Sequence, residues 1–488
     1  MFAKYVYEKS PALFAKRILI TDFDKLNKEN DFLSYFKEKG FAVIKYTNDL
    51  DFRINHTESL NDKDGQFILY ADKDSYIPYD IRKQFELYEV TLSSLFSKLN
   101  AAYLAESRIN LDLLSMAYKE CFDNYSTALL TEQFIKEKVQ STNNIKEYVR
   151  YIYKSLCKKV EDIADYLGWL NFAKEKAELM TLATEYGLDS IVDDGYFDEY
   201  FINYVLKNYG TLSSKLSNTT PVLVSKAMEY MSSKSKKFAV IVMDGMSEFD
   251  WKIISESFSD LKYNESGVFA MIPTTTSVSR QCLLSNKYPN HLLSPWTQAK
   301  EKEEFVNCAK SLGYQSSEIE YHRGYDASFG LNAKCVAIVI NDVDDIVHGQ
   351  TQGREGMLNQ MRLLARKREL KIMVKSILSS GMDVYITADH GNTPCVGTGK
   401  VMGAGVDVET KSRRMLVLKD FADKEALIEK YGVYEYPPYY LNKEYTYMIC
   451  PIGKSLDSKG EDVMTHGGIS VDEVIVPFIS LKAGDNNG

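Results

Sequence analysis

The 488-residue sequence lacks the features that mark membrane-spanning, secreted or disulfide-linked proteins. No apolar run approaches the roughly 20 residues of a membrane helix, and the N-terminus has no apolar signal core. The seven cysteines are odd in number, widely spaced and contain no Cys-x-x-Cys pair, which argues against a disulfide framework and a zinc ribbon. We therefore expect a cytoplasmic protein with reduced thiols and no membrane partner.

A large excess of one charge is also absent, since the formal net charge at pH 7 is −9. This value argues against a chain specialised as a whole for polyanions, although it leaves room for a local basic groove. Hydrophobic residues make up 45% and charged residues 26%, as in ordinary globular proteins. At this length we expect roughly two to four domains.

Chain-breaking residues are missing from a long stretch in the first half of the sequence. Residues 79–220 contain no proline, and residues 79–167 contain no glycine, a composition that favours helix. An apolar stripe at helical spacing is formed by Leu92, Leu95, Phe96 and Leu99. We expect a helical domain at 86–232 that serves as a scaffold or binds a protein partner.

A small α/β domain is expected before the helical one, at residues 1–85. Apolar runs at 17–24, 41–46 and 67–72 predict strands, and 32–39 predicts a helix between the first two. This alternation is typical of a small parallel sheet.

The third predicted domain, residues 233–488, alternates apolar strands with helices. Helices are predicted at about 300–313 and 353–379, and the strands at 238–243, 267–272, 335–340 and 384–388. Nearly continuous apolar strands are typical of a parallel-rich sheet that helices cover on both faces. The overall fold class is therefore α/β.

An insertion is expected within this third domain at about 396–447. Turns and many tyrosines interrupt the strand–helix rhythm there, and the segment is expected to lie over the functional site. We expect the main sheet to resume at about 445–450.

Histidine is scarce, and three of the six histidines fall at predicted strand ends or glycine turns of the third domain. Aspartates accompany them, and ligands of open α/β sheets lie just beyond the carboxyl ends of the strands. The side chains divide into two sets of three, Asp344, His348 and His466 in one, and Asp244, Asp389 and His390 in the other. Mixed oxygen and imidazole ligands suit zinc or manganese, and two metals are the recurrent device for displacement at phosphorus.

A nucleophile for such chemistry is available in a run of hydroxyl residues between a predicted strand and helix. Thr276 is the candidate, and Thr274 and Thr275 remain alternatives because Pro-Thr-Thr-Thr is also an ordinary turn. A threonine beside a metal loses its proton more easily and can attack phosphate. Arg280, one turn further on, could bind a phosphate oxygen or lie exposed on the helix.

Five motifs in this region resemble the PglZ-type domain of the alkaline phosphatase superfamily, over about residues 233–480. They are Met243-Asp-Gly-Met-Ser, Pro273-Thr-Thr-Thr-Ser-Val-Ser-Arg, Asn341-Asp-Val-Asp-Asp-Ile-Val-His, Thr387-Ala-Asp-His-Gly and Thr465-His-Gly-Gly-Ile-Ser-Val-Asp-Glu. The resemblance implies an alkaline-phosphatase-like core and two zinc ions. It implies Thr276 as nucleophile and as a ligand, together with Asp244, Asp389 and His390, of one ion, and Asp344, His348 and His466 as ligands of the other. The sulfatase branch would need Cys-x-Pro-x-Arg where this chain has Thr276-Ser-Val-Ser-Arg280.

The resemblance also implies a role in bacteriophage defence, in a BREX-type system, with a partner protein bound through the N-terminal domains. We expect a phosphodiesterase acting on nucleotides or nucleic acid. Arg280 is the one evident cation near Thr276, whereas a monoester dianion favours several. The tyrosines of the insertion could stack a nucleobase or simply pack the insertion: Tyr431, Tyr434, Tyr436, Tyr439 and Tyr440. The alternatives are a phosphomonoesterase, or a defence or signalling scaffold with a phosphatase fold and little turnover.

Overall fold

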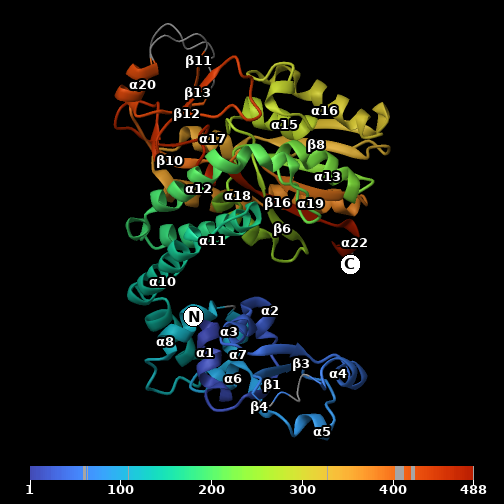
Figure 1. Cartoon of the computed structure of the whole chain (residues 1–488), viewed down its shortest axis with the longest axis vertical. Helices are drawn as coiled ribbons and strands as arrows, with labels where there is room; N and C mark the ends of the chain where they lie inside the picture. Colours follow the sequence, from blue (N-terminus) through green and yellow to red (C-terminus); the bar gives the residue numbers. More distant parts are fainter. Residues whose placement is uncertain are drawn as a thin grey trace. The chain divides into compact units, whose positions relative to one another are not determined.

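The computed structural model describes residues 1–58, 62, 64–107, 109–326, 328–401, 412–418 and 424–486. Its contacts divide the chain into two compact units, Met1–Tyr148 and Val149–Gly488 (Figure 1). The three predicted domains, 1–85, 86–232 and 233–488, remain a prediction. Among the described helices, none is long and apolar enough to cross a membrane.

The first unit contains a four-stranded parallel sheet, which confirms the small α/β arrangement expected there. The strand order is β2-β3-β1-β4, with β1 at Arg17–Asp22, β2 at Ala42–Lys45, β3 at Phe67–Ala71 and β4 at Glu86–Val90. Helix α3 at Phe32–Glu38 lies between β1 and β2 in the sequence.

Strand β4 corrects the expectation of helix throughout residues 79–220, because it completes the first sheet beside β1. Missing glycine and proline permit a helix, but they permit an edge strand equally well. The apolar stripe after β4 is buried as expected, although helix α6 covers only Leu92–Leu95. The longer helices that follow are α8 at Leu111–Tyr118, α10 at Thr142–Glu161, α11 at Tyr166–Glu185 and α12 at Asp194–Asn208.

The second unit is built on a six-stranded mixed sheet with the order β6-β16-β9-β5-β8-β7. Strands β7, β8, β5 and β9 are mutually parallel, and β16 runs antiparallel to both β9 and β6. The bounds are β5 Phe238–Met243, β6 Asn264–Phe269, β7 Ile319–Arg323, β8 Cys335–Ile340, β9 Asp383–Thr387 and β16 Ile475–Leu481. The strand expected at 267–272 therefore begins three residues earlier.

Helices cover both faces of this sheet. Gly267 on β6 faces Leu170 of α11 and Glu248 of α14, which spans Glu248–Ile254. The preceding residue, Ser266, pairs with Phe478, and the ring centroids of Phe478 and Tyr230, on α13, lie 5.7 Å apart. Because successive strand residues point to opposite faces, α11 and α14 cover one face and α13, Ala227–Lys234, covers the other.

Two predicted helices of this unit are present with small changes. Helix α16 spans Glu301–Ser311. The long helix expected at 353–379 is two helices, α18 at Gly353–Lys367 and α19 at Glu369–Ser379. They are separated at Arg368, which has a left-handed φ of 61°.

The predicted insertion at 396–447 supplies most of one small sheet, and the segments on either side of it form a second small sheet. Strands β11 (Met415–Leu418), β13 (Thr446–Ile449) and β12 (Tyr434–Tyr436) make one antiparallel sheet. Strands β14 (Lys454–Ser455), β10 (Thr393–Gly397) and β15 (Asp462–Thr465) make the other. The expectation that residues 445–450 rejoin the main sheet is thus wrong, because an apolar run does not reveal its pairing partners. Residues 402–411 and 419–423 of the insertion lie outside the described residues.

Candidate active site

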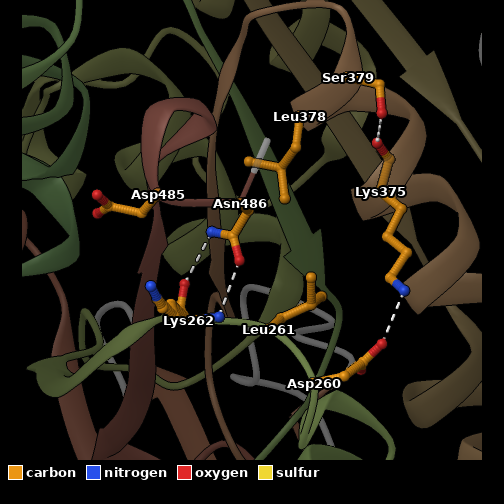
Figure 2. Close-up of a pocket in the computed structure, with 8 residues that line it drawn as sticks. All are labelled: Asp260, Leu261, Lys262, Lys375, Leu378, Ser379, Asp485 and Asn486. Carbon is orange, nitrogen blue, oxygen red and sulfur yellow. Dashed lines mark hydrogen bonds and ion pairs between the residues drawn. The ribbon is translucent and has the colours of Figure 1, made fainter. Parts of the chain in front are cut away.

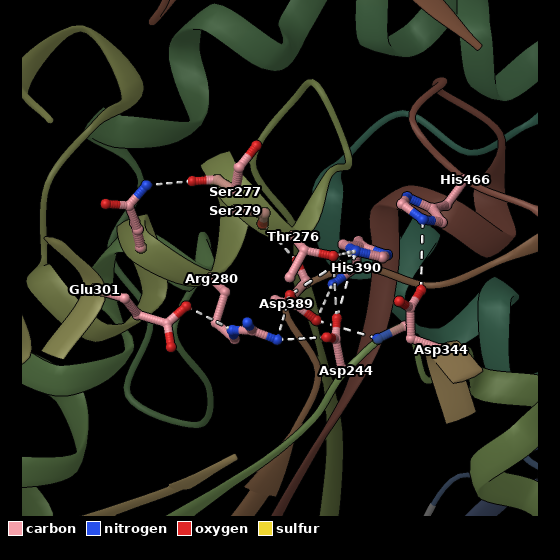
Figure 3. Close-up of polar contacts among 12 residues, drawn as sticks. Asp244, Thr276, Ser277, Ser279, Arg280, Glu301, Asp344, Asp389, His390 and His466 are labelled. Carbon is pink, nitrogen blue, oxygen red and sulfur yellow. Dashed lines mark hydrogen bonds and ion pairs between the residues drawn. The ribbon is translucent and has the colours of Figure 1, made fainter. Parts of the chain in front are cut away.

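The predicted site residues come together at one edge of the main sheet (Figure 3). Asp244 follows β5, and Asp389 and His390 follow β9. Asp344 lies in α17, Asp342–Gly349, directly after β8. His466 precedes the reversed strand β16, so its turn lies at the same edge.

One cluster consists of Asp244, Asp389 and His390, as the sequence predicted. All three are buried, and their ligand atoms lie within 4.8 Å of one another. His390 Nε2 is 3.7 Å from Asp244 Oδ1 and 3.8 Å from Asp389 Oδ2.

A second cluster consists of Asp344, His390 and His466, whose ligand atoms also lie within 4.8 Å of one another. His466 Nε2 is 3.5 Å from Asp344 Oδ1, and the rings of His466 and His390 stack 4.1 Å apart. His348, predicted for this set, has its Nε2 3.4 Å from Asp344 Oδ2, and its side chain is 41% exposed. His390 thus joins the two clusters, and His348 lies at their rim.

Each cluster contains a buried carboxylate oxygen that could bind a cation. Asp389 Oδ2 and Asp344 Oδ1 are inaccessible to solvent, and no described residue donates a hydrogen bond to either. Burial and the neighbouring Asp244 raise the pKa of Asp389 well above its usual range, which shows that its negative charge is poorly compensated by the protein alone. Oxygen and imidazole ligands in this arrangement fit two divalent ions.

The two central histidines are oriented by backbone carbonyl groups. His466 Nδ1 lies 3.0 Å from Thr274 O, and His390 Nδ1 lies 3.0 Å from Gly391 O. Because a carbonyl only accepts, each Nδ1–H donates, and each Nε2 keeps its lone pair toward the clusters. Burial is the main cause that lowers the pKa of His466 to about 4, and the nearby His390 adds to this effect. The ring of His466 is therefore neutral at pH 7.

Among the three threonines, Thr276 is the one whose hydroxyl lies against a cluster. Thr276 Oγ1 is 3.1 Å from His390 Nε2 and 3.3 Å from Asp244 Oδ1. Thr274 is fully buried, and its hydroxyl donates to the carbonyl of Gly468 at 2.9 Å. Thr275 is also buried, and its hydroxyl has no hydrogen-bond partner among the described residues.

Arg280 does not occupy the position that a phosphate clamp requires. It is 1% exposed, its Nη1 donates to Asp244 Oδ2, and its Nε donates to Glu301 Oε2 at 2.7 Å (Figure 3). Because two buried carboxylates occupy the guanidinium, Arg280 orients Asp244 from behind the site. The spacing in the motif correctly placed Arg280 near Thr276, but Glu301 lies 21 residues further along the chain and gave no sequence signal.

A second buried network supports the turns that bear the ligands. Asn392 Nδ2 donates to Asp250 Oδ2 at 2.6 Å and to Gly245 O at 2.9 Å. A Cβ on Gly391 would lie 1.9 Å from Asp472 O, so only glycine fits this turn. Sequence reasoning assigned no role to Asn392, although its place directly after Asp-His-Gly was a usable signal.

The clusters open into a pocket of about 520 Å³, within the size range of small-molecule sites. Its walls include Thr276, Trp296, Gln298, Asn341 and His348. No lysine or arginine is among the described residues that line it.

Another pocket of about 430 Å³ lies between Asp260–Lys262, α19 and the C-terminal helix α22 at Ala483–Asn486 (Figure 2). Its Lys375 is paired with Asp260 and its Asn486 with Lys262, and none of the candidate ligands lines it.

The five tyrosines named in the insertion pack the protein rather than face the clusters. Tyr440 stacks on Tyr288 at 4.7 Å, and its hydroxyl donates to backbone carbonyls of Tyr209 and Gly210. Tyr439 likewise donates to the carbonyl of Leu206. The remaining three also lie outside the lining of the pocket: Tyr431, Tyr434 and Tyr436. Their use as stacking platforms for a nucleobase is therefore not supported.

A family model described as the BREX system PglZ alkaline phosphatase-like domain matches residues 222–481. The chain belongs to the PglZ family. Its fold is accordingly an alkaline-phosphatase-like α/β fold with a parallel-rich sheet. Membership in this family supports a phosphoester hydrolase of a BREX defence system, for which the Asp and His clusters are a possible metal site.

Solved structures with similarity to this PglZ protein include two phosphorus-processing enzymes. Human ectonucleotide pyrophosphatase/phosphodiesterase 5 is 13% identical, with 51% of this chain and 90% of that chain covered and a TM-score of 0.37. Phosphonoacetate hydrolase from Sinorhizobium meliloti 1021 is 9% identical, with 50% and 90% covered and a TM-score of 0.34. No curated protein matches the chain.

Proposed function

We propose that this PglZ protein is a metal-dependent phosphodiesterase that uses Thr276 as its nucleophile. The observation that carries the proposal is the position of Thr276 Oγ1, within 3.3 Å of both Asp244 and His390. The hydroxyl thus touches a cluster in which Asp389 Oδ2 has no hydrogen-bond partner among the described residues.

Two divalent ions, zinc by ligand type, would be held by the clusters. Asp244, Asp389 and His390 would bind one, and Asp344, His466 and the nearby His348 would bind the other. Bound there, the ions would supply positive charge that lowers the pKa of the Thr276 hydroxyl and offsets the charge of the phosphate.

The chain's own groups then account for a two-step displacement. Thr276 Oγ1 releases its proton to water and forms a bond to phosphorus, while the bond to the leaving ester oxygen breaks and that oxygen takes the electron pair and a proton from water. A second water then attacks phosphorus and loses a proton, the bond between phosphorus and Oγ1 breaks, and Oγ1 regains a proton as the phosphate monoester leaves. Arg280 contributes by holding Asp244 in place, because its guanidinium is bound to buried carboxylates.

The choice of a diester follows from the charges in the pocket. A monoester dianion favours several cationic donors around its free oxygens, whereas a diester has a single negative charge and a second substituent. The described lining residues include no lysine or arginine. Nucleotides or nucleic acid are the proposed diesters, in the cytoplasm, with a BREX partner protein bound by the N-terminal residues.

The test compares hydrolysis of bis(p-nitrophenyl) phosphate and p-nitrophenyl phosphate by the zinc-loaded protein. We expect a higher kcat/KM for the diester, and a loss of at least about a thousandfold in Thr276→Ala because the attacking oxygen is removed. Thr297→Ala is the matched control, since Thr297 lines the same pocket but is exposed. A preference for the monoester would contradict the diesterase, and an active Thr276→Ala would reassign the nucleophile. No turnover of either ester by the wild-type protein would favour a scaffold.

A further inference from the structure

A second, smaller pocket adjoins the proposed active site. Its volume is about 260 Å³, and it lies between the segments 289–296 and 441–447. Trp296 lines both this pocket and the pocket that contains Thr276. The Trp296 side chain is therefore a wall that the two pockets share. We call the smaller pocket the aromatic subsite.

The segment that bears Trp296 is attached to the helical turn that bears the nucleophile. The buried side chain of Gln281, on α15 (Gln281–Ser285), donates to Ser294 O at 3.0 Å and to Thr297 O at 2.9 Å. These two carbonyls flank Trp296, and Gln281 directly follows the Thr276–Arg280 turn. Trp296 therefore has a defined position relative to Thr276.

The opposite wall is attached to the same segment. Asn290 N donates to Tyr440 O at 3.0 Å, and the rings of Tyr440 and Tyr288 stack at 4.7 Å. Tyr445 meets Trp296 edge to face, with ring centroids 6.4 Å apart and an angle of 80°. The rings of Trp296 and Tyr445 thus form two adjacent, nearly perpendicular walls of the subsite.

The lining has the chemistry of a site for a neutral, flat ring. Its polar members are Asn290 and Asn442, and its apolar and aromatic members are Pro289, Leu292, Pro295, Trp296, Leu441, Tyr445 and Tyr447. The described residues that line it include no charged side chain. No described residue hydrogen-bonds to the indole N–H of Trp296 or the hydroxyl of Tyr445, so both are available to a polar edge of a ligand.

We propose that the aromatic subsite binds a planar aromatic group attached to the phosphate, with a nucleobase as the occupant that the lining favours. The inference rests on the proposed function for the phosphate itself, and it names the substituent that the enzyme selects. A phosphate would be disfavoured in the subsite, since its charge would meet no cation there, whereas a base would stack on Trp296 or Tyr445.

Binding to the inactive Thr276→Ala protein, loaded with zinc, tests the proposal without turnover. AMP, ribose 5-phosphate and phenyl phosphate are compared by calorimetry. AMP should bind about 5- to 150-fold more tightly than ribose 5-phosphate, the factor expected from stacking of one base. Added Trp296→Ala or Tyr445→Ala should reduce this ratio to about one. Tyr445→Ala should also leave the affinity for ribose 5-phosphate unchanged, because Tyr445 lines the aromatic subsite and not the pocket that contains Thr276. Trp296→Phe should keep most of the ratio and shows that the protein remains folded.

Tyr79→Ala is the control for loss of a tyrosine, because Tyr79 is 78% exposed and belongs to the first compact unit. Equal affinities for AMP and ribose 5-phosphate, or a ratio that survives Trp296→Ala and Tyr445→Ala together, would overturn the subsite. If phenyl phosphate exceeded ribose 5-phosphate in affinity by a larger factor than AMP does, the occupant would be a simple aryl group, and the assignment of a nucleobase would be overturned. The diesterase proposal is judged separately, by turnover of bis(p-nitrophenyl) phosphate in the protein with Thr276 intact.

Discussion

Arg280→Met should destabilise the second unit strongly, because it leaves buried negative charge uncompensated. The guanidinium is 1% exposed and pairs with the Asp244 and Glu301 side chains, which are 3% and 2% exposed. Removing one partner of a buried ion pair costs about 3–5 kcal/mol, a large part of the roughly 5–15 kcal/mol that stabilises a typical domain. Methionine preserves much of the volume, so the loss measures charge rather than a cavity.

Arg323→Met is the matched control, since Arg323 pairs with the same glutamate. Its Nη2 lies 3.1 Å from Glu301 Oε1, but its side chain is 47% exposed. Exposed ion pairs contribute about 0–1 kcal/mol, so this variant should unfold nearly as the wild type does. The difference between the two variants therefore reports the burial of the cation, with the carboxylate held constant.

Urea unfolding, monitored by tryptophan fluorescence, measures this difference in the second unit. All three tryptophans, at positions 169, 251 and 296, lie within Val149–Gly488. A chelator should be present so that metal binding does not add to stability. With a slope of about 3 kcal/mol per M, the Arg280→Met midpoint should fall by roughly 1–1.7 M. Equal midpoints for the two variants would refute the reasoning and return Arg280 to a role in the pocket.

Two further predictions concern metal content and pH. His466→Ala should lower the bound zinc measured by elemental analysis from about two ions per chain toward one. His322→Ala is the control and should leave the zinc content unchanged, because His322 pairs with Glu320. An unchanged zinc content in His466→Ala would exclude His466 as a ligand. Glu248 is buried, and burial raises its carboxyl pKa from 4.5 to about 8. The stability it contributes is complete below pH 4.5 and is lost as the pH rises through about 8, by up to about 1.4 kcal/mol per pH unit. We expect the urea midpoint of the wild-type protein to fall between pH 5 and 8 and that of Glu248→Gln to fall less, and an equal fall in both proteins would contradict this assignment.

Four of the six strands of the main sheet, β5, β6, β8 and β9, could be predicted from the sequence, together with the side chains that follow β5 and β9. Strands β7 and β16 were not predicted. Asp244 and the Asp389–His390 pair each follow an apolar run directly, and the carboxyl ends of parallel strands meet at one edge. Their proximity in space therefore follows from local patterns plus one rule of topology. Asp344 and His348 were predicted on one side of a turn for a similarly local reason, their spacing of four residues on a helix.

The partners of groups that are distant in sequence are visible only in the folded chain. Arg280 faces Glu301 and Asp244 rather than solvent, His390 stacks on His466 and joins both clusters, and β13 pairs within a small separate sheet. Residue spacing specifies which face of an element a side chain occupies, but not which other element covers that face. Burial, charge pairing and strand partners depend on that second choice, and so they become visible only when the whole chain is folded.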